Sequence, residues 1–186
     1  MAQEQTNSSH IPTATEIGTA ITAQHGMIRM AFQEAKGSAG QRQRHTTRRL
    51  LQLLAMHEAA EQLTVHPALA RAGGGEVGIG DDRMAEEEQA VQLAERLQEF
   101  EPGSYEHGMQ LALLEEAVTQ HAEAEEMSEL PLIDDLDESE RRKIGEAVGA
   151  VARAVQEDRL VEYQDFSGMV RRARGWLEGR TGGIAR

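Results

Sequence analysis

Apolar side chains recur every three or four residues along most of the chain, which is the spacing of an amphipathic α-helix. The first such stretch begins with Thr13 and Glu16, the pattern of a capping box, and ends at the glycine-rich residues 37–40. Its inner face consists of Gly18, Ile21, His25, Ile28, Phe32 and Ala35. No segment alternates strictly between apolar and polar residues, so the pattern predicts an all-α protein.

Three further stretches share this helical periodicity. A basic, polar linker, residues 41–49, leads into the second helix, which stops near Pro67. The third helix is expected from about residue 82 to residue 100, and the fourth from near residue 104 to just before Pro131. Because the connections are short, these helices predict an up-down-up-down four-helix bundle over residues 13–133.

The two ends of the chain differ from this bundle. Residues 1–12 are polar and predict a disordered tail. In residues 134–186, the segment 138–156 has a helical apolar face, and 165–178 is a second, shorter helical segment. We interpret residues 134–186 as additional C-terminal helices that pack on the bundle or form a contact with a second copy or a protein partner.

Composition narrows the possible chemistry. The net charge is −13 and the pI is about 5.0, which disfavours binding to nucleic acid. The chain has no cysteine, so disulfides, thiolate zinc sites, iron–sulfur clusters and cysteine nucleophiles are excluded. No stretch approaches the ~20 apolar residues of a membrane span, and residues 1–9 do not form a secretory signal. A cytoplasmic protein without a membrane partner is therefore expected.

The strongest candidates for a functional site are two His-x-x-x-Glu pairs, His57–Glu61 and His121–Glu125. Four residues span about one helical turn, so each histidine shares a face with its glutamate. Both pairs, and His25, lie on apolar helix faces, where unpaired charges are costly. In an up-down bundle all five converge near one end, which predicts a metal site. The alternative is that the histidines and glutamates satisfy one another by hydrogen bonds alone.

The third helix contributes three consecutive glutamates, Glu86, Glu87 and Glu88. Glu87 falls on the stripe that faces the core and is the expected ligand, although acidic residues at a helix start also complement the helix dipole.

No metal-binding role is expected for the remaining histidines and tyrosines. His66 is expected to be a capping or surface residue near the mouth of the site, and His107, ~21 Å from His121 along the helix, a polar helix-start residue. His10 lies in the tail and His45 in the basic linker, and nothing places Tyr105 or Tyr163 at the site.

Imidazole and carboxylate ligands without thiolate favour iron or manganese, and less specifically zinc. Two His-x-x-x-Glu turns suit a dinuclear site in which Glu61 and Glu125 bridge the ions, and iron is our first choice. No catalytic residue separate from the metal ligands is evident.

The chain resembles the hemerythrin-like, or HHE cation-binding, proteins. The resemblance covers about residues 13–133. It rests on His25 within residues 24–29, on the block 57–61 followed by His66-Pro67, and on residues 121–126 followed by Pro131. It implies a four-helix bundle with a non-haem di-iron centre that is oxo- or hydroxo-bridged.

The resemblance also implies roles for individual residues. His25, His57 and His121 would be terminal ligands, and Glu61 and Glu125 bridging ones. The family pattern expects a histidine on the third helix, but this chain has Glu87 at the aligned position. The metal ligands expected are thus His25, His57, Glu61, Glu87, His121 and Glu125.

A more anionic site stabilises ferric iron, which favours reaction with dioxygen or hydrogen peroxide, in a catalase-like redox defence, over reversible oxygen carriage. The alternative is a non-enzymatic module that binds or senses oxygen, iron or redox state.

Overall fold

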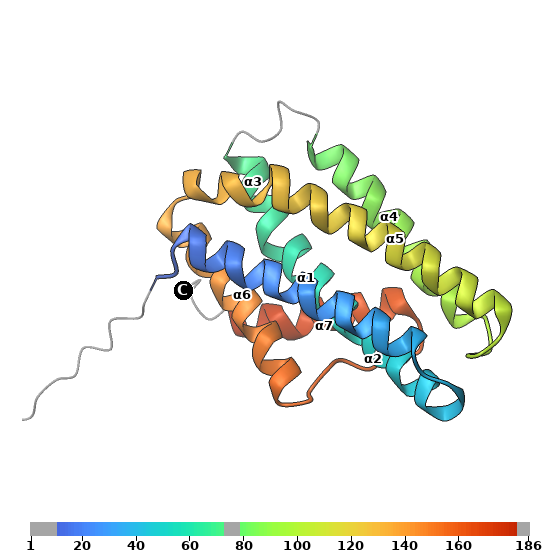
Figure 1. The fold of residues 1–186 in the computed structure, drawn as a ribbon. Coiled ribbons are helices and arrows are strands. Elements are labelled where there is room, and N and C mark those ends of the chain that lie inside the picture. The colour runs from blue at the N-terminus through green and yellow to red at the C-terminus, as the bar shows by residue number, and fades with distance from the viewer. Residues whose placement is uncertain (1–10, 73–78, 182–186) are drawn as a thin grey trace, which may run out of the picture.

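A computed structural model describes residues 11–72 and 79–181, and the side chains within these ranges except those of residues 79–85 (Figure 1). Within these ranges the chain is helical and contains no strand, which confirms the all-α prediction. The α-helices are α1 (Ala14–Lys36), α2 (Gly40–Ala60), α3 (His66–Arg71), α4 (Ile79–Gln98), α5 (Tyr105–Ser128), α6 (Glu138–Gln156) and α7 (Phe166–Thr181). A π-helical segment, η1 (Glu61–Val65), joins α2 to α3, and a 3₁₀ segment, η3 (Leu130–Asp135), follows α5.

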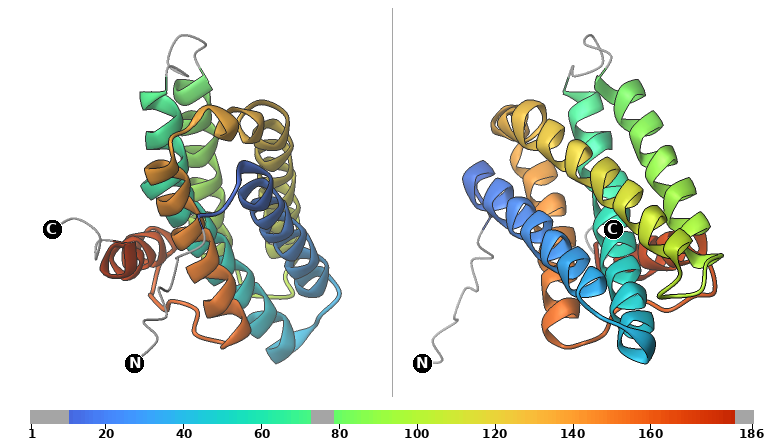
Figure 2. Two further views of the ribbon diagram at one scale, coloured as in Figure 1. Left: turned by 90° about the vertical axis from the view of Figure 1, so that its left-hand side faces the viewer. Right: turned by 45° about the vertical axis from the view of Figure 1, so that its right-hand side comes forward.

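The long helices α1, α2, α4 and α5 form the expected bundle with additional C-terminal helices (Figures 1 and 2). Helix α1 packs against α2 and α5, and α4 packs against α5. Helix α6 lies against α1 and α2, while α7 contacts α2, α4 and α6. The C-terminal helices therefore cover the α2 side of the bundle, and a contact with a second copy stays a prediction.

Side-chain caps set the starts of three helices. At α1 the expected capping box is present: the Glu16 amide donates to Thr13 Oγ1 at 3.2 Å, and the Thr13 amide donates to Glu16 Oε2 at 2.8 Å. Ser104 accepts from the amide of His107, and Asp137 from that of Glu140. Each cap satisfies amides that the helix itself leaves unpaired, typically contributing about 1 kcal/mol.

Two predictions about the second helix are wrong. The basic residues 41–49 are not a linker, because α2 begins at Gly40, whose φ of +57° suits glycine. Pro67 does not stop the helix either, because the chain continues through η1 into α3. Pro67 lies in the first turn of α3, where proline is tolerated because its missing N–H removes no essential bond.

The apolar core is divided into two clusters. The larger contains residues of α1, α2, α4, α5, α6 and α7, such as Leu54 and Leu114, and the smaller contains Ile17, Ile21 and Val65. On α1, Ile21 belongs to the smaller cluster and Ile28 to the larger, with His25 between them. A layer of buried polar side chains therefore separates two hydrophobic clusters, and this layer contains the site.

Candidate metal centre

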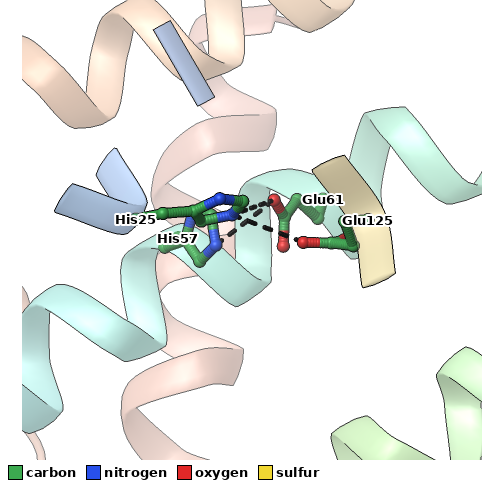
Figure 3. Close-up of side chains that lie close together, drawn as sticks. All are labelled: His25, His57, Glu61 and Glu125. Carbon is green, nitrogen blue, oxygen red and sulfur yellow. Dashed lines mark ion pairs between the residues drawn. The ribbon is translucent and has the colours of Figure 1, made fainter. Parts of the chain in front are cut away.

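Four buried side chains from α1, α2, η1 and α5 converge at the polar layer (Figure 3). Their donor atoms, from His25, His57, Glu61 and Glu125, lie within 4.8 Å of one another, and each residue is at most 3% exposed. The ring nitrogen Nε2 of His57 is 3.2 Å from Glu61 Oε1. The Nε2 atom of His25 is 3.4 Å from Glu125 Oε2 and 3.9 Å from Glu61 Oε1. One position can thus be surrounded by two imidazoles and two carboxylates.

Two further groups of donors adjoin this one. The first is formed by Glu58, Glu87 and His121, and the second by His66, Glu125 and Glu129. Glu125 connects the groups, because its oxygens lie 3.4 Å from His25 Nε2 and 3.2 Å from His66 Nε2. It also lies 3.5 Å from Nε2 of His121. Together the three groups offer enough donor atoms for more than one cation.

Partners outside the cluster hold the other nitrogen of three imidazoles. Nδ1 of His25 lies 2.8 Å from Glu126 Oε1, and Nδ1 of His121 lies 3.2 Å from Glu86 Oε2. Nδ1 of His57 donates to Gln24 Oε1 at 3.1 Å, while the Gln24 amide nitrogen donates to the Val148 carbonyl of α6. Each pairing orients the ring and leaves Nε2 facing the carboxylates, as in histidines that bind metals.

The imidazoles of the cluster differ in charge. Burial disfavours a charge on His25, but the neighbouring carboxylates Glu125 and Glu61 outweigh it and raise its pKa to about 10. Burial is likewise outweighed at His66, where Glu125 and Glu87 raise the pKa to about 11. Burial and the adjacent His25 instead lower the pKa of His57 to about 3. Without a metal, two imidazolium ions neutralise part of the carboxylate charge.

The pKa values of the carboxylates are also shifted in opposite directions. Burial, reinforced by neighbouring carboxylates, raises the pKa of Glu58 and of Glu61. Burial also acts to raise the pKa of Glu125, but contacts with His25 and His66 hold it well below its usual range. Glu125 therefore stays ionised more readily than Glu58 and Glu61, and it lies at the centre of the cluster.

Several buried donor atoms lack a hydrogen-bond partner of normal geometry. They are His25 Nε2, Glu58 Oε2, both carboxylate oxygens of Glu61, His121 Nε2 and Glu125 Oε2. Buried polar atoms are nearly always paired, and leaving them unpaired costs about 1–3 kcal/mol each. Cations bound at these atoms would satisfy them, so the residues fit an N/O-ligated metal centre.

Comparison with known families decides the identity. The model of the hemerythrin HHE cation-binding domain matches residues 17–133, more than half of the chain. The protein belongs to the hemerythrin HHE family. No curated protein and no solved structure matches it. Among the described residues of this hemerythrin-like chain, no helix is long and apolar enough to cross a membrane.

The structure brings together all six residues expected as ligands, in two adjoining groups. Among the three consecutive glutamates of the hemerythrin-like chain, Glu87 is buried and belongs to a donor group. Glu86 instead holds the outer nitrogen of His121, and Glu88 is exposed. Glu61 lies beside His25 and His57, whereas Glu125 reaches histidines of all three groups. Glu125 therefore connects the donor groups.

Three members of the cluster were not predicted: Glu58, Glu129 and His66. Glu58 is one residue away from the stripe of His57, yet its buried side chain reaches the second group. His66 is partly exposed and lies beside the site, as expected, but it is more than a surface residue, because its two ring nitrogens contact Glu87 and Glu125. The periodicity of a regular α-helix does not predict that His66 joins the cluster.

The π-helical segment explains the position of His66. In a regular helix His66, nine residues after His57, would point to the opposite side, since each residue rotates by ~100°. The His66 amide instead bonds to the Glu61 carbonyl, five residues back, which inserts one extra residue into the turn. His57, Glu61 and His66 then occupy equivalent places on one stripe.

His107 also differs from its predicted character. It does lie in the first turn of α5, but it is only 1% exposed, and both ring nitrogens lack a hydrogen-bond partner. Burial lowers its pKa, so the ring is neutral. It lines a cavity of about 730 Å³ with Thr47 and Leu97 and belongs to none of the donor groups found in the described part of the chain. Tyr105 and Tyr163 are exposed and lie outside these groups as well.

Proposed function

We propose that this hemerythrin-like protein holds two iron ions in the buried cluster and reacts with dioxygen or hydrogen peroxide in redox defence. The expected ligands are His25, His57, Glu61, Glu87, His121 and Glu125, with an oxo or hydroxo group between the ions. The observation that carries this proposal is the layer of four imidazoles and five carboxylates, all buried except the partly exposed His66, in which several donor atoms lack a hydrogen-bond partner.

The composition of the layer supports iron. Nitrogen and oxygen donors without thiolate suit iron and manganese, and the excess of carboxylates over imidazoles stabilises the ferric state. A stable ferric state works against reversible oxygen carriage, which requires the ferrous pair to persist. We therefore place redox chemistry ahead of carriage.

The space beside the cluster supports a very small reactant. A cavity of about 10 Å³ adjoins the layer, bounded by His25, His57, Glu58 and His121. Its other walls include Ile28, Phe32, Val118 and Ala122. A volume of this size is near the minimum that one water molecule requires, so an organic substrate does not fit.

The residues of the chain then have distinct tasks. Bound iron would supply the electrons for reduction or disproportionation of the reactant. Gln24, Glu126 and Glu86 fix the orientation of three imidazoles from outside. Phe32 and Val118 limit access of bulk water, and Glu125 keeps the donor groups at a constant separation.

Iron analysis, an optical spectrum and a peroxide assay test this proposal. We expect about two irons per chain, a near-ultraviolet band from the bridged ferric pair, and peroxide consumption that is lost in His57→Ala. His45→Ala is the matched control, because His45 is an exposed histidine on the same helix. A purified protein that takes up no iron refutes the proposal, and iron uptake without turnover supports the sensor alternative.

A further inference from the structure

The second donor group has only one imidazole. It contains His121 with Glu58 and Glu87, whereas the first group contains both His25 and His57. The third group supplies another histidine, His66, within reach of Glu125. A dinuclear centre built from the six expected ligands alone would therefore leave this imidazole unused inside the cluster.

We propose that His66 is a ligand of the second iron through Nε2, while its Nδ1 keeps a proton that faces Glu87. This inference rests on the proposed function, because it assigns a residue to the second ion of that centre. The chain thereby obtains from the first residue of α3 the imidazole that its third bundle helix lacks among residues 86–98.

The contacts of His66 match those of a metal-binding histidine. Its Nδ1 lies 2.8 Å from Oε1 of Glu87, itself an expected ligand, just as Nδ1 of His25 lies 2.8 Å from Glu126 Oε1. Its Nε2 lies 3.2 Å from Glu125 Oε1 and 3.7 Å from Glu129 Oε2. One nitrogen held by a carboxylate and the other directed at further carboxylates is the arrangement that orients an imidazole toward a cation.

The backbone reinforces this assignment. Only the extra residue of η1 brings His66 onto the stripe of His57 and Glu61. Single π-turns of this kind are uncommon and occur frequently at functional sites. The Thr64 hydroxyl donates to the Ala60 carbonyl at 2.7 Å, so it provides a partner for a backbone oxygen at the irregular turn.

The competing role for His66 is that of a permanent cation. A protonated ring between Glu87 and Glu125 would neutralise two carboxylates without binding metal. The two roles require different protonation at Nε2, because a ligand must present a free electron pair there. They also respond differently to lysine, which supplies the charge but lacks the imidazole.

Metal counting on variants separates the roles. We expect two irons per chain in the wild type and in the exposed-site control His45→Gln, and one iron in both His66→Gln and His66→Lys. Two irons with an unchanged spectrum in either His66 variant overturn the inference while leaving the proposed function intact. A wild-type protein without bound iron overturns both.

A measurement on the wild type avoids dependence on the folding of variants. In protein labelled with ¹⁵N on histidine and loaded with Zn²⁺, which accepts the same donors and is diamagnetic, the His66 ring should show one protonated and one metal-bound nitrogen. The signals are assigned by their loss in His66→Gln. A ring with both nitrogens protonated in the loaded protein refutes the inference.

Discussion

Loading the centre with metal should release protons from the cluster. The structure places two imidazolium ions among the donors, because neighbouring carboxylates raise the pKa of His25 to about 10 and that of His66 to about 11. Both are protonated at pH 7, and both must lose a proton for Nε2 to bind a cation. Glu58 and Glu61, whose pKa values burial raises, add further protons.

The size of the pH dependence of metal binding follows from these pKa values. Between pH 7 and pH 9 both imidazoles stay protonated in the metal-free protein, so metal loading displaces at least two protons per chain. The overall association constant for loading both sites should then rise by at least about 100-fold per pH unit, which is roughly 2.7 kcal/mol. If His66 is not a ligand, its proton is not displaced, and the rise per pH unit is about 10-fold smaller.

Calorimetric titration with Fe²⁺ under anaerobic conditions measures this effect. Repeating the titration at pH 7.5 in two buffers of different ionisation enthalpy gives the number of protons released. His45→Ala should behave as the wild type, because its exposed ring lies outside the cluster. Release of fewer than one proton per chain would show that the imidazoles are already neutral and would refute the reasoning.

Three further predictions concern the surroundings of the centre. Gln24→Leu removes the partner of His57 Nδ1 and should weaken metal binding by roughly 10–100-fold without unfolding the chain, as competition with a chelator would measure; unchanged affinity contradicts a role in orienting the ring. His107→Phe should raise the free energy of unfolding by about 1–3 kcal/mol, because the native ring is buried without partners. Burial lowers the pKa of His107, so the unfolded chain binds the proton more tightly, and stability is lost as the pH falls below about 6.5; urea unfolding at pH 7 and pH 5 should show a smaller loss in the variant, and an equal loss argues against this sign. Leu114→Ala should lower stability by about 2–5 kcal/mol through a cavity in the larger cluster, while the folded fraction keeps its metal content, and a lost ion would instead indicate coupling between core and site.

Much of the site follows from regular helical periodicity. His57 with Glu61, and His121 with Glu125, were found because four residues form about one turn and both pairs lie on apolar faces. His25 was found because it interrupts the apolar stripe of α1, between Ile21 and Ile28. These predictions needed only the assumption that each helix is regular and buries its apolar side.

The residues that escaped prediction are those for which this assumption fails. His66 enters the cluster because η1 adds one residue to a turn, and nothing in the local sequence states that a π-turn forms there. Glu58 lies off the stripe, but α4 and α5 pack closely enough to enclose its carboxylate with Glu87 and His121. His107 is buried by segments distant in sequence, including the end of α4.

The sequence by itself determined the all-α class, the helix caps and the two His–Glu turns, because these depend on spacings within one helix. The tertiary structure alone decided how many donors meet, because burial and convergence depend on the packing of several helices. It also decided which donors carry charge, since the same imidazole has a raised pKa at His25 and a lowered one at His57, according to its neighbours.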